Sequence, residues 1–139
     1  MRFVDRKEEL QRLERLVRTG GLAVLWGRRR IGKTRLLLEW CKQHGGLYTV
    51  ADQSGAAIQR RYFAASVATR FPGFEQVEYP DWRSLLNRIS AESMHRRWRG
   101  PLIVDEFPYL AATSPELPSV FQAWVDHEAK EAKLAVALA

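Results

Sequence analysis

The chain of 139 residues has a net charge of +6, and its proportions of hydrophobic (46%) and charged (27%) residues are typical of a soluble globular protein. No apolar run is long enough to span a membrane, and the N-terminus lacks the apolar core of a signal peptide. The single cysteine, Cys41, excludes an internal disulfide framework. We therefore expect one cytoplasmic domain over residues 1–139.

The chain begins with a predicted amphipathic helix that is followed by a strand. Asp5 and Glu8 have the spacing of a capping box, and leucine and valine side chains between residues 10 and 17 form one apolar face. Two glycines at residues 20–21 end this helix. The apolar run at residues 22–26 then predicts the first strand.

The first strand leads into a phosphate-binding loop. Residues 27–34 read Gly-Arg-Arg-Arg-Ile-Gly-Lys-Thr, a full Walker A pattern between a strand and a helix-like run. Gly27 and Gly32 are expected to allow left-handed or strained backbone angles, so that N–H groups of the loop and of the following helical turn face the phosphates. Lys33 is expected to reach the β- and γ-phosphates, and the Thr34 hydroxyl to bind Mg²⁺.

The arginines of this loop leave two interpretations open. Arg28, Arg29 and Arg30 either form a solvated basic rim that attracts the nucleotide or contact phosphate or nucleic acid directly. The residues expected at the nucleotide are Gly27, Arg28, Arg29, Arg30, Ile31, Gly32, Lys33, Thr34 and Arg35.

The middle of the chain contains a predicted strand at residues 47–50 and two helices. The first helix carries Ile58, Tyr62 and Val67, a stripe that we expect in the core. Asp81 is the predicted N-cap of the second helix. The buried face predicted for the second helix consists of Trp82, Leu85, Leu86 and Ile89.

An apolar strand followed by two carboxylates forms the other half of the candidate site. Residues 101–104 show no polar alternation, which is typical of a strand buried on both faces of a parallel sheet. Asp105 and Glu106 follow at its carboxyl end, where open α/β sheets bind ligands. This is a Walker B arrangement, in which Asp105 holds Mg²⁺ through its water shell and Glu106 orients or deprotonates the attacking water. The alternative is an acidic pair that merely ends a strand.

The last part of the chain predicts a helix and another buried strand. Ser114 and Pro115 mark the start of the helix, and residues 134–138 form the strand. The apolar face of the helix consists of Val120, Phe121, Trp124 and Val125. The basic cluster at residues 95–99 is either a set of solvated charges favoured by a helix dipole or a nucleic-acid patch.

Three segments, residues 3–10, 27–34 and 104–110, together resemble the archaeal-type ATPase family, which belongs to the AAA+ and STAND-related branch of P-loop proteins. The resemblance implies an α/β, three-layer P-loop NTPase core with a mainly parallel sheet, ATP rather than GTP as the nucleotide, and an adenine site near residues 3–9. Asp5 stands where such proteins usually have glycine.

The same resemblance implies that the core is incomplete at its C-terminus. In such proteins the strand matching residues 134–138 is followed by a γ-phosphate sensor, a fifth core strand, a lid and often a further domain. With the first strand beside the fourth, absence of the fifth leaves the first strand as an exposed apolar edge.

Magnesium-dependent ATP binding is therefore the primary function that we expect, with weak or partner-dependent hydrolysis to ADP and phosphate. Lys33 and Glu106 are the expected catalytic residues, while Thr34 and Asp105 are the metal residues. One alternative is a nucleotide-regulated interaction module that binds a protein partner or self-associates through the incomplete sheet. The other is a nucleic-acid binder that uses the loop arginines and residues 96–99.

Overall fold

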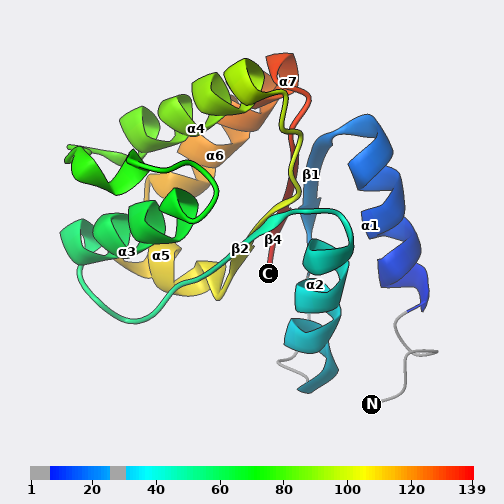
Figure 1. Cartoon of the computed structure of the whole chain (residues 1–139). Coiled ribbons are helices and arrows are strands. Elements are labelled where there is room, and N and C mark those ends of the chain that lie inside the picture. Colours follow the sequence, from blue (N-terminus) through cyan, green and yellow to red (C-terminus); the bar gives the residue numbers. More distant parts are fainter. Residues whose placement is uncertain (1–6, 26–30) are drawn as a thin grey trace.

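A parallel sheet with helices on both faces forms the centre of the molecule (Figure 1). The structure is a computed structural model that describes residues 7–25 and 31–139. The sheet order is β1-β4-β3-β2, with all neighbouring pairs parallel. In chain order the strands are β1 (Gly21–Val24), β2 (Leu47–Val50), β3 (Leu102–Asp105) and β4 (Ala135–Leu138). The predicted α/β class and the predicted pairing of the first strand with the fourth are confirmed.

Two helices cover one face of the sheet. They are α1 (Lys7–Thr19) and α2 (Ile31–Gln43). Their buried side chains, among them Leu13, Leu37 and Trp40, pack on small or branched residues of the central strands such as Ile103 and Ala137. Cys41 is buried in the same layer, as predicted, and burial raises the pKa of its thiol.

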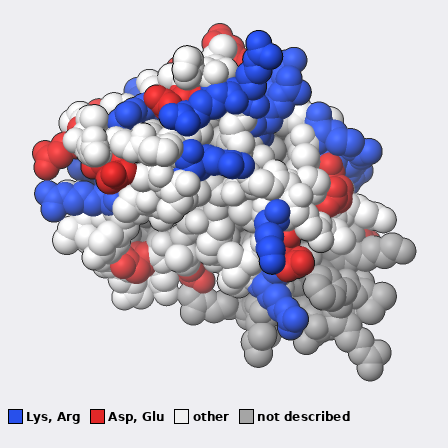
Figure 2. Space-filling model, in the orientation of Figure 1, with Lys and Arg blue, Asp and Glu red and all other residues white. Residues whose placement is uncertain are grey.

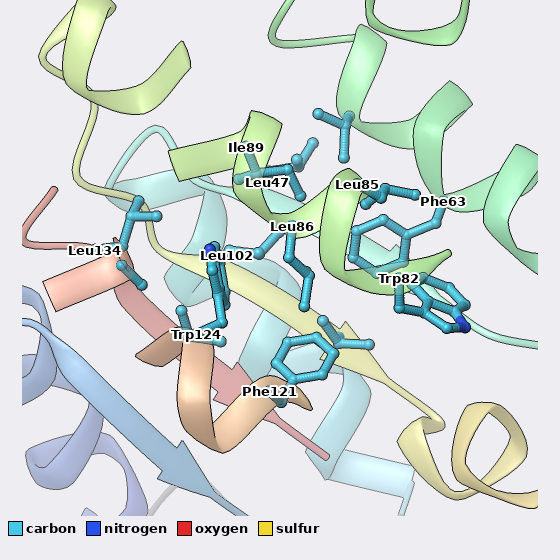
Figure 3. Close-up of a cluster of buried hydrophobic side chains, with 14 of the residues drawn as sticks. Leu47, Phe63, Trp82, Leu85, Leu86, Ile89, Leu102, Phe121, Trp124 and Leu134 are labelled. Atoms are coloured by element: carbon cyan, nitrogen blue, oxygen red, sulfur yellow. The ribbon is translucent and has the colours of Figure 1, made fainter. Parts of the chain in front are cut away.

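The opposite face carries the larger core (Figure 3). It is covered by α3 (Ala56–Ala68), the 3₁₀ turn η2 (Phe74–Gln76), α4 (Trp82–Arg96), α5 (Phe107–Thr113), α6 (Leu117–Asp126) and α7 (Glu128–Glu131). Phe63 and Trp82 meet edge to face at 5.5 Å between ring centroids, and Phe121 and Trp124 do so at 5.8 Å. Among the described residues, no helix is both long and apolar enough to cross a membrane.

Helix α4 follows the prediction from sequence closely. The Asp81 carboxylate accepts a hydrogen bond from the Ser84 N–H at 2.8 Å and so caps the helix. The four apolar residues predicted for its inner face, Trp82, Leu85, Leu86 and Ile89, are all buried.

The face predicted for α3 is only partly correct. Val67 is fully buried as predicted, but Ile58 and Tyr62 are 45% and 56% exposed, and Phe63 is buried instead. The buried stripe begins at the polar residue Gln59, whose amide nitrogen donates to the Asp52 carbonyl oxygen at 2.8 Å. Because this amide is hydrogen-bonded, a polar side chain can occupy the core.

The segment after β3 also differs from the prediction. Ser114 does not start a helix but ends α5, and its hydroxyl accepts a hydrogen bond from the Trp82 indole at 3.0 Å. Helix α6 begins three residues later with Glu116 as its N-cap and Pro118 in its first turn. The sequence did not predict the short helices α5 and α7. Val120, which was predicted on the apolar face of α6, is only partly buried.

We expect Phe63→Ala to lower the free energy of unfolding by about 3–5 kcal/mol, since it removes a buried ring from the larger core. The neighbouring control Tyr62→Ala should change it by no more than about 0.5 kcal/mol, because that ring is mostly exposed. Chemical denaturation of both variants measures this difference. Equal losses would contradict the observed orientation of α3.

Candidate functional site

The candidate site lies where β1 and α2 approach the carboxyl end of β3. The Leu25 N–H donates to the Leu138 carbonyl oxygen at 2.8 Å, which ties the end of β1 to β4. Residues 26–30 lie outside the described residues, so the roles expected of Gly27, Arg28, Arg29 and Arg30 stay predictions. The remaining residues of the motif, Ile31, Gly32, Lys33, Thr34 and Arg35, lie in the first two turns of α2.

The start of α2 supplies backbone donors. The first N–H groups of an α-helix have no partner within the helix, and the positive end of its dipole lies at the same place. An anion is therefore stabilised beside these residues. Gly32 belongs to the helix itself, so the left-handed or strained backbone expected there is wrong; helical angles are open to any residue.

Asp105 is the centre of the hydrogen bonding at the site. It is only 1% exposed, and its carboxylate accepts hydrogen bonds from three donors. The Thr34 hydroxyl donates to Oδ2 at 3.2 Å, the Tyr48 hydroxyl donates to the same oxygen at 2.5 Å, and the Glu106 N–H donates to Oδ1 at 2.9 Å. Three donors compensate the burial of this carboxylate and fix its orientation.

Tyr48 is a residue of the site that the sequence analysis missed. It lies in β2, two residues before Val50, which is in register with Asp105. Because side chains two residues apart on a strand point to the same face, Tyr48 and Asp105 project from the same face of the sheet. Burial, followed by the hydrogen bond to Asp105, raises the pKa of the Tyr48 phenol. The hydroxyl therefore keeps its proton and remains a donor to Asp105 throughout the physiological range of pH.

Lys33 and Glu106 line a hollow of about 390 Å³. Glu106 is the N-cap of α5 and has a left-handed backbone (φ 59°, ψ 35°). The rest of the wall is mostly apolar and comes from β1, the start of α5, α6 and the end of β4. Its apolar members include Leu22, Val24, Phe107, Phe121 and Leu138. A cation and a carboxylate therefore lie at the polar part of a largely apolar groove.

Elsewhere, the described residues form other hollows but no cluster of side chains that could hold a metal ion. One such hollow, of about 600 Å³, lies between α3 and residues 75–80. Its charged side chains include Arg61 and Glu78, which pair with each other at 3.6 Å. No group of three or more His, Cys, Asp or Glu side chains in the described part of the chain could hold a metal ion.

Comparison with known proteins gives one informative relative. The sequence is 32% identical over 133 residues to the uncharacterized protein MJECL04 of Methanocaldococcus jannaschii, a match that covers 94% of this chain. The chain spans only 28% of the length of that relative. No protein-family model and no solved structure matches the sequence.

We expect Tyr48→Phe to destabilise the protein by roughly 1–3 kcal/mol, because it removes a hydrogen bond to a buried carboxylate. The matched control is Tyr62→Phe, which removes the hydroxyl of an exposed tyrosine and should have an effect within about 0.5 kcal/mol. Denaturant unfolding of the two variants tests the prediction. If both are as stable as the parent, Tyr48 does not hold Asp105.

Proposed function

We propose that this chain is a magnesium-dependent ATP-binding domain of the P-loop NTPase type, related to the archaeal-type ATPases. One observation carries the proposal. Thr34 of the Walker A segment and Asp105 of the Walker B segment are 71 residues apart in sequence, yet their side chains are hydrogen-bonded at 3.2 Å. Two motifs with complementary roles at a nucleotide therefore meet at one point of the fold.

The residues at that point fit the chemistry of a magnesium nucleotide. Mg²⁺ prefers oxygen ligands and keeps several waters and phosphate oxygens, so a hydroxyl and a carboxylate from the protein are enough to position it. Thr34 supplies the hydroxyl and Asp105 the carboxylate, which Tyr48 keeps oriented. Lys33, two residues into α2, adds a positive charge beside the N-terminus of the helix.

Hydrolysis requires more than this binding site. Glu106 lines the same hollow as Lys33, so its carboxylate is our candidate for orienting an attacking water. A transition-state arginine is worth about 10³–10⁵ in rate, and none is assigned among the described residues. We therefore propose slow turnover by this chain, with a partner required for rates typical of ATPases.

The decisive experiment is thermal unfolding with and without Mg-ATP. At about 100 times the dissociation constant, bound ligand should stabilise the fold by about 2.7 kcal/mol. Lys33→Ala should remove this stabilisation because it deletes the charge at the phosphates. Lys42→Ala is the matched control, since it removes an exposed lysine from the last turn of the same helix and should leave the stabilisation unchanged.

Two results would contradict the proposal. One is an unfolding temperature of the folded parent chain that millimolar Mg-ATP leaves unchanged, and the other is a Lys33→Ala variant that Mg-ATP stabilises as fully as the parent. Either result would mean that the motif does not form a nucleotide site in this chain.

Glu106→Gln tests the catalytic role separately. It should retain stabilisation by Mg-ATP, because the phosphate and magnesium contacts are intact, and should reduce phosphate release at least about 10²-fold from the parent rate. Phosphate release and thermal unfolding are measured on the same samples. Release by Glu106→Gln equal to that of the parent would exclude Glu106 as the residue that activates water.

The second candidate is a nucleotide-regulated interaction module. It is favoured by the apolar groove that reaches Lys33 and Glu106, because a bound γ-phosphate at these residues would alter the groove. β1 also forms one edge of the sheet within the described residues. A second copy of the chain is the simplest occupant, and light scattering tests it: molecular mass that changes with Mg-ATP supports this function, and constant mass contradicts it.

A further inference from the structure

A basic hollow lies at the end of the sheet opposite the phosphate site. Arg99 and Lys133 come shortly before β3 and β4, so they lie at the amino edge of these strands, where the Ala135 N–H donates to the Arg99 carbonyl oxygen at 2.9 Å. Together with Arg97 they line a shallow hollow of about 470 Å³, in which Glu131 is the only acidic residue. Figure 2 shows lysine and arginine side chains gathered at the top of the view, over the end of α4 and α7.

A second basic hollow has Arg97 in its lining in common with the first. It measures about 250 Å³ and is also lined by Arg70, Arg96 and Trp98. Two of its arginines have structural partners: the Arg96 guanidinium pairs with Glu92 at 3.1 Å, and the Arg70 guanidinium lies over the Trp98 ring at 5.4 Å from its centroid. Both hollows are lined by Arg97, and we call their basic residues the basic track: Arg70, Arg96, Arg97, Arg99 and Lys133.

The three cations of the first hollow have no such partners. Arg97, Arg99 and Lys133 are exposed, and their side chains make no hydrogen bond or ion pair with any residue that the structure describes. Partners elsewhere in the fold therefore do not explain why these charges converge.

Two of these residues have a left-handed backbone, which costs conformational energy in any residue with a Cβ. Arg97 and Lys133 have left-handed φ values of 56° and 57° just after α4 and α7, a position where glycine is usual because it has no Cβ. At the same edge, α1 and α2 are followed by Gly20 and Gly45, with φ values of 72° and 62°. The left-handed position is thus a glycine after α1 and α2, but it is a cation after α4 and α7, the two helices beside the hollow.

The helix dipole does not account for this choice. A cation anywhere in the last turn interacts favourably with the negative end of the dipole. Helices α1 and α2 have Arg18 and Lys42 in their last turns and keep glycine afterwards, and α4 already has Arg96 in its last turn. The interaction with the helix dipole therefore does not require cations with a left-handed backbone at Arg97 and Lys133. We infer that the positive charges of these two side chains have another function.

We propose that this basic track, centred on Arg97, Arg99 and Lys133, binds the phosphate backbone of a nucleic acid. Several cations spread over two shallow hollows fit a chain of phosphates better than a single small anion, because each cation can contact a different phosphate of the chain. The track lies at the opposite end of the strands from Lys33 and Asp105, so the inference does not depend on the proposed ATP site. Binding through phosphates carries no sequence preference.

The test is fluorescence anisotropy of a labelled single-stranded DNA of about 20 nucleotides, titrated with the full chain at salt concentrations from about 50 to 200 mM. The double variant Arg97→Gly/Lys133→Gly removes two charges and relieves both left-handed positions. Its unfolding temperature should therefore equal or exceed that of the parent. Its affinity for the DNA should fall at least about tenfold, and the slope of log affinity against log salt should decrease by about two.

Arg12→Ser/Arg83→Ser is the matched control, because it lowers the net charge equally at exposed residues of α1 and α4 away from the track. It should bind DNA nearly as well as the parent. The proposal is overturned if the parent does not bind the DNA, if both double variants weaken binding equally, or if poly-glutamate competes as well as nucleic acid. In the last case the track is a surface for acidic proteins. Lys33→Ala should bind DNA normally, which separates this result from the ATP site.

Discussion

The burial of β3 is the constraint on which the rest of the structure depends. Leu102, Ile103 and Val104 are fully buried because β2 and β4 flank the strand and helices cover both of its faces. If a strand enclosed in this way shifted its register, its apolar side chains would come into contact with water or with polar groups. Asp105 is therefore held at a fixed position at the carboxyl end of β3, where α2 and β2 bring Thr34 and Tyr48 to it.

The parallel arrangement also gives the two ends of the sheet different chemistry. Helices that run back between parallel strands begin near the carboxyl ends of the strands and end near the amino ends. Positive helix ends and a buried carboxylate consequently meet at one edge, which suits a magnesium nucleotide. Lysines and arginines collect at the other edge, around Arg97 and Lys133, where a polyanion is favoured. The proposed nucleotide site and the proposed nucleic-acid track therefore lie at opposite edges of the sheet.

The elements predicted most accurately from the sequence are those defined by a regular pattern of buried apolar residues. The four strands and the inner face of α4 were predicted correctly because their apolar residues have clear spacing. The inner face of α3 was predicted only at Val67, since the polar Gln59 belongs to it and is held there by hydrogen bonds to Asp52, Tyr109 and Thr113. Tyr48 was missed because its approach to Asp105 depends on the register of β2 with β3. That register is a property of the sheet, not of either segment alone.

A double-mutant cycle on Thr34 and Asp105 tests the central claim most directly. ATP affinity is measured with and without Mg²⁺ for the parent, Thr34→Ala, Asp105→Asn and the double variant. If both side chains position one magnesium ion, each single change removes most of the gain from Mg²⁺, and the double variant loses little more, which corresponds to a coupling energy of about 0.5–3 kcal/mol. Affinity that does not depend on Mg²⁺, or losses that simply add, would contradict the account.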